Sequence, residues 1–441
     1  MTAYNLWNQY FTRRKLKYLF HSKIKNRSSV GLDWIGTEKF EKELDQNIDL
    51  ILRKCNNSTY KFTRYRELLL SKGANKPPRC ISIPTVRDKL VLSALNEILA
   101  GVYGTKIATP MPQVIIKEII NQIQTKEFDA FIKLDIKTFY PSIDQRLLMK
   151  TLRRKIRKKE ICSLIEKAIL TNTNQPNSMS QFPCETKGVP EGLSISNALA
   201  NIYMSAIDKK HSQEKDRYFY CRYVDDILII TSKSNVESVK LAITKDIDAL
   251  KLKINSEKTG DGAIADRFEY LGYMISDKSV SIRKNSVISL ERNLETIFRR
   301  YASSDNKNIK HLKWRVDLKV TGFIIGKRKY GWLFFYSQIS DLSVLARLDW
   351  LIDTLCLRFD IPNNIHFKRF MKTYHEITKA LHTTRYIPNL DEYSIQDKRM
   401  IVQQIYGEDV EGRDDNFVEM RFQRLINREI RDTQRDVQPF S

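Results

Sequence analysis

Residues 221–230 read Cys-Arg-Tyr-Val-Asp-Asp-Ile-Leu-Ile-Ile. Aromatic and β-branched residues on both sides of the acidic pair predict two short strands, with Asp225 and Asp226 at the turn between them. A tight turn can bring two adjacent acids to the same side of a hairpin. Carboxylate oxygens are ligands that Mg²⁺ prefers. An isolated acidic pair is more often a solvated turn, so the rest of the chain decides between the two interpretations.

The chain has 441 residues and a formal net charge of +23, from 75 Lys and Arg against 52 Asp and Glu. Such a length can bury a large core and hold more than one domain. The positive charge predicts a polyanionic partner, nucleic acid before a membrane surface. The cysteines show no Cys-x-x-Cys spacing, which argues against a zinc-binding module. No apolar run approaches the roughly 20 residues of a membrane span, so we expect a cytoplasmic protein without a membrane partner.

Three further segments carry candidate chemistry. Asp135 lies in an apolar strand at 131–136, where a carboxylate is costly unless it is paired or bound to a metal. A basic turn between two strands predicts a site for phosphate oxygens, with Lys72, Lys76 and Arg79 as its cations. Residues 188–194 read Gly-Val-Pro-Glu-Gly-Leu-Ser and precede a long helical pattern. The two glycines of that loop allow the backbone to approach a ligand closely.

The remaining patterns predict an α+β chain that is rich in helices. Residues 1–50 read as basic helices, residues 150–159 as one basic helix and residues 236–252 as an amphipathic helix. Strands are expected at 252–258 and 268–275, and residues from 281 to the end are expected to be mainly helical. The aromatic stretch 330–336 is expected to be core rather than a platform for stacking bases.

The ordered set of motifs resembles the reverse transcriptases. The resemblance covers about residues 55–280 and rests on the Asp135 strand, the 188–192 loop, Tyr223-Val224-Asp225-Asp226, Lys258, Leu271-Gly272-Tyr273 and the fingers-like 79–84 with Asp88-Lys89. It implies a right-hand polymerase whose palm is an antiparallel sheet packed on helices. The boundaries expected are 1–50 for an N-terminal helical basic extension, 51–130 for the fingers and the start of the palm, 131–280 for the palm with the catalytic motifs, 281–360 for a thumb-like helical region and 361–441 for a C-terminal helical extension.

The resemblance also implies an RNA-directed DNA polymerase that uses deoxynucleoside triphosphates. Asp135, Asp225 and Asp226 would be catalytic and hold two Mg²⁺ ions, with Mn²⁺ as a substitute, around an in-line displacement. Tyr140 would exclude the 2′-hydroxyl of a ribonucleotide, and Lys258 would protonate pyrophosphate. The implied nucleotide-binding residues are Arg79, Lys72, Lys76, Ile136, Tyr140, Gly192 and Lys258; the implied primer and template contacts are Pro190, Glu191, Ser196, Tyr223, Leu271, Gly272 and Tyr273.

Two positions depart from the family pattern. Glu191 stands where Gln is usual and Asn197 where Pro is usual, which bears on primer or template handling rather than on the metal site. Residues 320–322 resemble a thumb motif of retron enzymes, and residues 331–338 resemble defence-associated and abortive-infection relatives. We see no endonuclease, integrase or ribonuclease H signature in the tail. The resemblance therefore implies a bacterial antiphage enzyme that copies a structured non-coding RNA into cDNA.

Three alternatives stay open at this point. The first is a template-independent or protein-primed DNA polymerase of abortive-infection type. The second is a retron or group II intron-type reverse transcriptase. The third is an RNA-binding protein with an inactive palm, and the three acids argue against it because buried carboxylates are costly to keep without a use. The sequence leaves the oligomeric state open.

Overall fold

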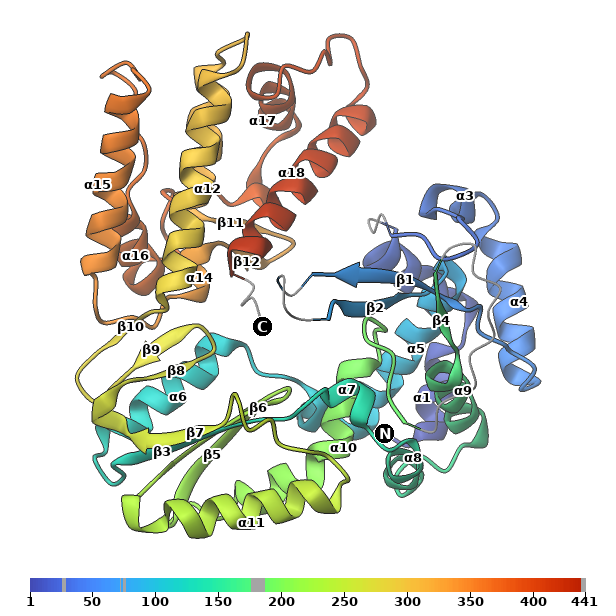
Figure 1. Ribbon diagram of the computed structural model, residues 1–441. Helices are drawn as coiled ribbons and strands as arrows, with labels where there is room; N and C mark the ends of the chain where they lie inside the picture. Colours follow the sequence, from blue (N-terminus) through green and yellow to red (C-terminus); the bar gives the residue numbers. More distant parts are fainter. Residues whose placement is uncertain (26–28, 72, 74–76, 176–186, 438–441) are drawn as a thin grey trace. The chain divides into compact units, whose positions relative to one another are not determined.

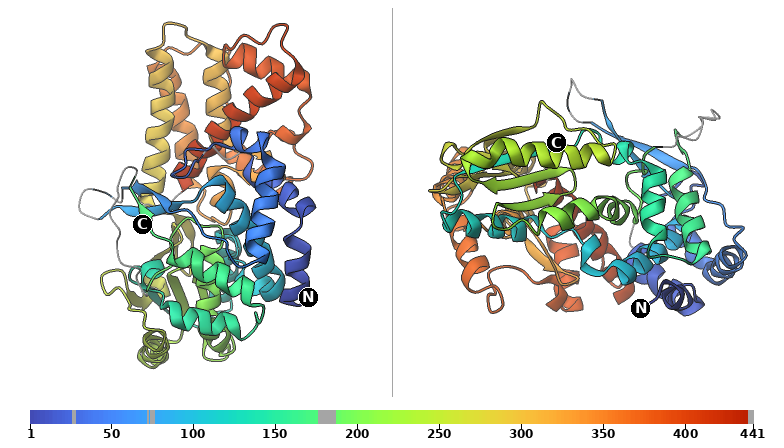
Figure 2. Two further views of the ribbon diagram at one scale, coloured as in Figure 1. Left: turned by 90° about the vertical axis from the view of Figure 1, so that its right-hand side faces the viewer. Right: turned by 90° about the horizontal axis from the view of Figure 1, so that it is seen from below.

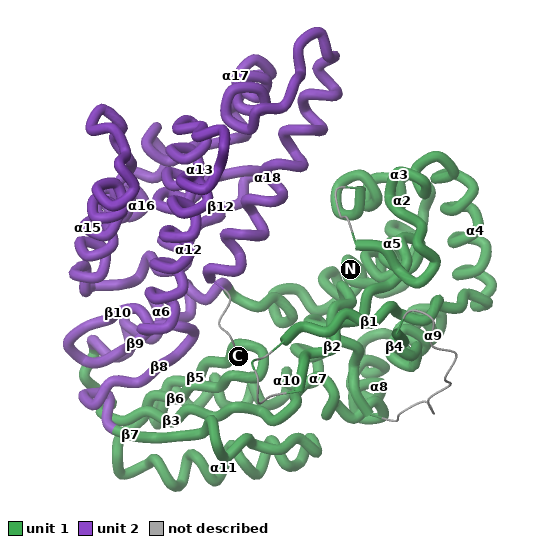
Figure 3. The backbone as a smooth tube through the Cα atoms, turned by 45° about the horizontal axis from the view of Figure 1, so that its top comes forward, with its two compact units in different colours: residues 1–110, 125–262 green, residues 111–124, 263–441 purple. Residues whose placement is uncertain are grey.

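The computed structural model describes residues 1–25, 29–71, 73, 77–175 and 187–437 (Figure 1). The chain divides into two compact units, and the second includes a short segment that interrupts the sequence of the first (Figure 3). The first unit comprises residues 1–110 and 125–262, and the second comprises residues 111–124 and 263–441. Each unit has a hydrophobic core of its own.

The sheet that carries the acidic hairpin lies in the first unit and has the strand order β5-β6-β3-β7. Its strands are β3 (Ala130–Asp135), β5 (Tyr218–Tyr223), β6 (Asp226–Thr231) and β7 (Gly260–Ala263). Strand β6 pairs antiparallel with both β5 and β3, which confirms the predicted hairpin. Side chains along a strand alternate between the two faces of a sheet, so the complete burial of its apolar run Ile227–Ile230 shows that both faces are covered at β6. The structure thus shows the expected α+β class with an antiparallel palm-like sheet.

Helices cover this sheet and join it to a smaller one. The right-hand view of Figure 2 shows α11, in yellow-green, running along the sheet, and α11 contacts β3. The smaller sheet has the order β2-β1-β4, in which β1 and β2 form the predicted basic hairpin. The other elements of this unit are α1 (Ala3–Tyr10), α2 (Arg13–Leu19), η1 (Phe20–Ile24), α3 (Thr37–Lys42), α4 (Leu44–Asn56), β1 (Tyr65–Leu70), β2 (Arg79–Ile83), α5 (Val86–Tyr103), η2 (Gly104–Ile107), α7 (Phe139–Ser142), α8 (Gln145–Arg153), α9 (Lys159–Leu170), β4 (Thr173–Asn174), α10 (Ser196–His211), η3 (Lys233–Asn235) and α11 (Val236–Ala249).

The second unit is mainly helical, with two small antiparallel sheets. Its elements are α6 (Pro112–Gln124), η4 (Ile264–Asp266), β8 (Phe268–Tyr270), β9 (Tyr273–Ile275), β10 (Val280–Ile282), α12 (Lys284–Ala302), α13 (Ile309–Thr321), β11 (Phe323–Ile325), β12 (Arg328–Tyr330), α14 (Trp332–Phe335), α15 (Ser343–Arg358), α16 (Phe370–Lys379), η5 (Leu390–Glu392), α17 (Ile395–Met400), η6 (Ile401–Ile405) and α18 (Asp415–Val437). The aromatic stretch at 330–336 is core, as predicted, because Trp332, Leu333, Phe334 and Tyr336 are buried.

Two local predictions were wrong. Residues 252–258 are not a strand: only Ile254 makes a β-bridge, and the segment turns so that Asn255 donates from its backbone to the Asp135 carbonyl at 2.8 Å. The basic helix at 150–159 is two helices, since α8 ends at Arg153 and α9 begins at Lys159. After residue 281 the chain is mainly helical, as predicted, and it also contains the β11–β12 hairpin. A Cβ at Gly322 would lie 2.1 Å from the Tyr330 carbonyl oxygen, so only glycine allows the chain to leave α13 and enter this hairpin.

One stretch differs from the expectation that no apolar run approaches the length of a membrane span. Residues Val86–Gln124 are long and apolar enough to cross a membrane by length and composition. Half of the most apolar window of that stretch is buried inside the structure, as in a core helix of a globular fold. This is weak evidence for a span, and the expectation of no membrane partner stays a prediction.

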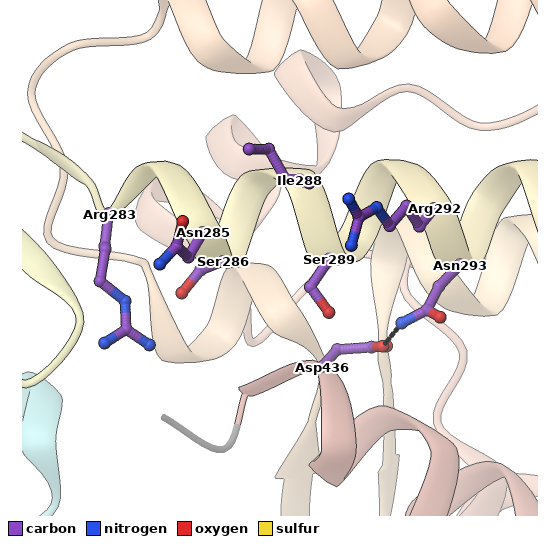
Figure 4. Close-up of a pocket in the computed structure, with 8 residues that line it drawn as sticks. All are labelled: Arg283, Asn285, Ser286, Ile288, Ser289, Arg292, Asn293 and Asp436. Atoms are coloured by element: carbon purple, nitrogen blue, oxygen red, sulfur yellow. Dashed lines mark hydrogen bonds between the residues drawn. The ribbon is translucent and has the colours of Figure 1, made fainter. Parts of the chain in front are cut away.

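A buried ion pair links α13 to the end of α18 in the second unit. The Lys319 side chain is 7% exposed and donates to Asp436, whose side chain is 1% exposed. Asn293 donates to the same carboxylate, at the edge of a cavity of about 430 Å³ along α12 (Figure 4). The cavity is lined by Arg283, Asn285, Ser286, Ile288, Ser289, Arg292, Asn293 and Asp436. The pair therefore fixes the C-terminal helix against the core of this unit.

Replacing Lys319 with methionine is expected to lower the free energy of unfolding by about 3–5 kcal/mol, because the Asp436 charge stays buried without its cation. Urea unfolding of the wild-type and Lys319→Met proteins measures this loss. The double variant Lys319→Met with Asp436→Leu is the control, since an apolar pair of similar volume should recover most of the stability. Equal stability of the wild-type and Lys319→Met proteins would contradict the structural role of the pair.

Candidate active site

Strand register brings the three predicted catalytic acids to one end of the central sheet. Asp135 ends β3 and Asp226 begins β6, and the two are direct partners across the antiparallel pair. Asp225 lies in the two-residue turn before β6, and its backbone carbonyl accepts a hydrogen bond from the Ile136 amide at 3.1 Å. Residues far apart in the sequence therefore meet because a strand and a hairpin pair side by side.

Burial makes the charged forms of Asp225 and Asp226 costly. It raises the pKa of Asp225, and the nearby Asp135 carboxylate raises it further. It also raises the pKa of Asp226 to about 6, although the Lys133 ammonium opposes the shift. The hydroxyl of Tyr223, opposite Asp226 on β5, has a raised pKa because of its own burial and these two acids. The site therefore gathers negative charge in a partly desolvated place.

Asp135 is held by two groups from the segment that follows α11. Its side chain is 8% exposed, and it accepts a hydrogen bond from the side-chain amide of Asn255 at 3.0 Å. The Lys258 ammonium lies 3.4 Å from its other oxygen, and that lysine is 44% exposed. Sequence analysis selected Lys258 but missed Asn255, whose type and spacing give no signal. Lys258 therefore forms an ion pair with Asp135 and is not an unpaired surface lysine.

These acids suit a divalent cation by their chemistry. Within residues 1–25, 29–71, 73, 77–175 and 187–437, no three His, Cys, Asp or Glu side chains converge as a ready-made metal cluster. The donor set nevertheless fits hard cations, because it supplies carboxylate oxygens. The charged forms of two of its members, Asp225 and Asp226, are destabilised by burial and by neighbouring carboxylates. A bound cation would relieve that destabilisation. Asp135, Asp225 and Asp226 are therefore the residues that would hold it.

The raised pKa values of Asp225 and Asp226 make stability depend on pH. Between the unfolded value near 3.8 and about 6, the native state binds more protons at Asp226 than the unfolded chain does. The metal-free protein is therefore expected to lose stability as pH rises through this window. Thermal unfolding from pH 4 to pH 7 in a chelator measures the slope, and Asp226→Asn should flatten it. A slope that Asp226→Asn leaves unchanged would contradict the assignment.

The loop predicted to contact primer and template packs against the basic hairpin. Arg79 on β2 forms an ion pair with Glu191, and the Ser82 amide donates to the Glu191 carbonyl at 2.7 Å. A Cβ at Gly192 would lie 2.7 Å from Ile81 Cγ2 and 2.9 Å from the Ser82 carbonyl oxygen. The glycine thus permits the close approach of loop and strand. Lys72 and Lys76 lie outside the described residues.

Substituting Glu191 with glutamine is expected to lower the KM for nucleotide by up to about fivefold. The substitution frees the Arg79 guanidinium from a partly exposed ion pair, a class worth up to about 1 kcal/mol. Steady-state kinetics with one nucleotide varied measures the change. Glu67→Gln, on the neighbouring strand, removes a charge without removing the Arg79 partner and serves as the control. An unchanged or higher KM for Glu191→Gln would show that the Glu191 carboxylate and the triphosphate do not compete for Arg79.

Three other predicted contacts, Tyr140, Ile136 and Ser196, also lie in the first unit. Tyr140 lies in the short helix α7, and its carbonyl accepts from the Val189 amide at 2.9 Å. Burial, followed by the Glu191 charge, raises the pKa of Tyr140 to about 12. Ile136 is buried directly after β3. Ser196 is also buried, and its hydroxyl donates to the Pro190 carbonyl at 2.6 Å. It therefore stabilises the 188–194 loop and is not exposed to a ligand.

The predicted primer contacts Leu271, Gly272 and Tyr273 belong to the second unit, between and within β8 and β9. Tyr273 is buried, and its hydroxyl donates to the Phe335 carbonyl. Gly272 has a φ of +82°, and a Cβ there would lie 2.8 Å from the Tyr336 hydroxyl oxygen. The site described above is built from the first unit alone.

Comparison with known proteins agrees with this site. Residues 70–275 match the family model for reverse transcriptase (RNA-dependent DNA polymerase), and they contain all three acids. Residues 70–275 are a reverse transcriptase domain. The chain therefore carries the catalytic domain of an RNA-directed DNA polymerase. Reverse transcriptases use divalent metal ions, which agrees with the carboxylate donor set.

The relatives of this reverse transcriptase domain are distant. Protein YkfC of Escherichia coli (strain K12) is 23% identical over 346 residues, covering 68% of this chain and 88% of YkfC. The group II intron-encoded protein LtrA of Lactococcus lactis subsp. cremoris is 24% identical over 217 residues, covering 48% of this chain and 36% of LtrA. A solved telomerase from Candida albicans, in complex with a fragment of telomeric RNA, has a TM-score of 0.47 and 14% identity over 87% of this chain and 68% of its own. At that TM-score the telomerase supports no conclusion about this chain.

Proposed function

We propose that the protein synthesises DNA complementary to a structured non-coding RNA, as part of bacterial antiphage defence in the cytoplasm. The observation that carries the polymerase part is the register that sets Asp135 against Asp226, with Asp225 in the adjoining turn, inside a reverse transcriptase domain. We keep the fingers, palm and thumb boundaries at 51–130, 131–280 and 281–360 as part of the same proposal.

The residues of the chain have distinct roles in this proposal. Asp135, Asp225 and Asp226 hold divalent cations, Mg²⁺ or Mn²⁺. Bound cations of this kind lower the pKa of a primer 3′-hydroxyl and neutralise a triphosphate. Arg79 leaves its ion pair with Glu191 and binds the oxygens of the triphosphate, because its planar guanidinium can donate two parallel hydrogen bonds to them. Lys258, close to Asp135, is placed to protonate the pyrophosphate as it leaves.

Template binding in this proposal depends on positive charge. The net charge of +23 predicts contacts to the phosphate backbone that release counterions. An RNA–DNA hybrid is recognised mainly by its A-form shape and backbone, so the palm itself would select no sequence. Choice of one RNA then comes from the helical regions at either end of the chain.

The defence role rests on resemblance within the second unit. Residues 331–338 resemble defence-associated and abortive-infection enzymes, and residues 320–322 resemble a retron motif. The two departures Glu191 and Asn197 both have partners in the structure, since Glu191 pairs with Arg79 and Asn197 donates to Thr109 at 2.9 Å. These contacts keep a template-independent or protein-primed activity as the second candidate.

Sequencing the nucleic acid that co-purifies with the protein from its native host tests the proposal. The proposal predicts one discrete structured RNA together with DNA complementary to it. DNA of repeated or random composition without a complementary RNA would favour template-independent synthesis. An intron RNA flanked by its own exons would instead favour an intron-type role. RNA without any DNA, in cells under phage attack, would favour the inactive RNA-binding protein.

A further inference from the structure

The turn that carries Asp225 has an unfavourable backbone conformation. Its two central residues are Val224 and Asp225, between the paired residues Tyr223 and Asp226. Val224 has a φ of +59°, and Asp225 does not have a positive φ. A hairpin turn with a positive φ at its first central residue prefers glycine there. A β-branched residue in that conformation is strained and persists only when its surroundings hold it.

The Arg222 side chain holds this turn from within the hairpin. Its Nη1 atom donates to the Val224 carbonyl oxygen at 2.7 Å. The side chain of Arg222 is only 7% exposed, so this hydrogen bond is largely shielded from water. On the other side of the turn, the Ile136 amide donates to the Asp225 carbonyl. The two peptide groups that flank the Asp225 side chain are therefore both fixed.

Arg222 is itself held by α10. Its Nε and Nη2 atoms donate to the two oxygens of Asp208 at 2.8 and 2.6 Å, a bidentate arrangement that sets the plane of the guanidinium. The Tyr220 hydroxyl donates to Asp208 at 2.9 Å, and Arg222 Nη2 also donates to Asn201 at 3.2 Å. The Asn201 amide in turn donates to the Ile107 carbonyl at 2.9 Å. The guanidinium is thus fixed by a helix on one side and fixes the turn on the other.

We propose that Arg222, oriented by Asp208, is a positioning residue that stabilises the strained Val224 turn and so holds the Asp225 carboxylate beside Asp135. In this role Arg222 acts through the backbone of the turn, by its hydrogen bond to the Val224 carbonyl. The inference rests on the proposed polymerase function and adds a residue to its machinery that the catalytic motif does not include. Asp208 and Tyr220 support the same arrangement from α10 and β5.

The first experiment measures cation binding and turnover for Arg222→Met and Arg222→Lys. Binding of Mn²⁺ to the nucleotide-free protein, followed by calorimetry, is expected to weaken about 10-fold to 100-fold in Arg222→Met, the range seen when a group that orients metal ligands is lost. The kcat for primer extension is expected to fall by a similar factor, with the KM for nucleotide nearly unchanged. Arg222→Lys should lie between, because lysine keeps one charge but cannot reach Asp208 and Val224 together.

Arg217→Met is the matched control, because Arg217 lies just before β5 on the same hairpin, is exposed and contacts Ser238 instead. It is expected to bind Mn²⁺ and turn over as the wild type does. Melting temperatures of all variants identify any loss of folding, and Arg222→Lys carries the test if Arg222→Met fails to fold. Wild-type Mn²⁺ affinity in a folded Arg222→Met protein would overturn the inference. This arm needs no polymerase activity, so it fails or succeeds independently of the proposed function.

The second experiment uses Val224→Gly to separate positioning from general stability. Glycine adopts a positive φ without strain, so the turn then needs less support. The loss of Mn²⁺ affinity caused by Arg222→Met is expected to be at least threefold smaller in the Val224→Gly background than in the wild type. An equal loss in both backgrounds would mean that Arg222 acts as a general packing residue, and it would overturn the proposed route through the Val224 backbone.

Discussion

The Asp225→Asn protein is expected to lose about 10³-fold in kcat while keeping its fold. The amide has the shape of the carboxylate but not its charge. In metal-ion catalysis, stabilisation of the transition-state charge is worth several kcal/mol. Each loss of about 1.4 kcal/mol lowers the rate tenfold. Its melting temperature without metal is expected to equal or exceed that of the wild type. Burial raises the pKa of Asp225, so the charged form destabilises the native state at neutral pH.

Asp261→Asn is the control for this experiment. Asp261 is on β7 of the same sheet, but its carboxylate pairs with Lys240 of α11 at 2.6 Å. It should polymerise at the wild-type rate, as measured by single-turnover primer extension with Mg²⁺. If Asp225→Asn polymerised as fast as Asp261→Asn, the assignment of Asp225 as a catalytic acid would be wrong.

The Tyr140→Ala protein is expected to incorporate ribonucleotides about 10²-fold more readily, relative to deoxynucleotides, than the wild type. Tyr140 is half-buried in α7, within electrostatic reach of Asp225, Glu191 and Arg79, and its carbonyl accepts a hydrogen bond from the Val189 amide. A ring fixed there can exclude the 2′-hydroxyl of a ribonucleotide by steric contact. Removing the ring should lower the discrimination between the two sugars by the amount that one such contact supplies. Competition between the two nucleotide types measures the ratio.

Tyr140→Phe keeps the ring and loses only the hydroxyl, so it is expected to retain the sugar selectivity of the wild type. The burial that raises the pKa of Tyr140 indicates that its hydroxyl remains neutral at physiological pH and contributes no charge. Unchanged selectivity in Tyr140→Ala would show that the ring is core packing rather than a gate against the 2′-hydroxyl.

Local pattern was sufficient for the elements that carry the acids. The apolar runs on each side of Asp225 and Asp226 predicted β5 and β6, because alternation and β-branching report directly on strands. The α+β class and the buried aromatic stretch at 330–336 followed in the same way. The resemblance to reverse transcriptases then supplied the pairing of Asp135 with the hairpin, which no local pattern contains.

The features that could not be predicted from the sequence depend on contacts between distant segments. Residues 252–258 look like a strand, but Asn255 and Lys258 turn toward Asp135 instead. The ion pair of Arg79 with Glu191 joins two motifs that were each assigned to a different ligand. Arg222 reads as an ordinary strand residue, and its role appears only when Asp208 of α10 is placed beside it. Tertiary contact overrides local preference in each case.

The most direct test of the account is primer extension by the purified protein on a defined RNA template with an annealed DNA primer. The account predicts DNA whose sequence is complementary to the template, made with Mg²⁺ or Mn²⁺ and abolished by Asp135→Asn and by Asp225→Asn. Addition of nucleotides without regard to the template, or equal extension by both variants, would contradict the claim that these acids catalyse RNA-directed DNA synthesis.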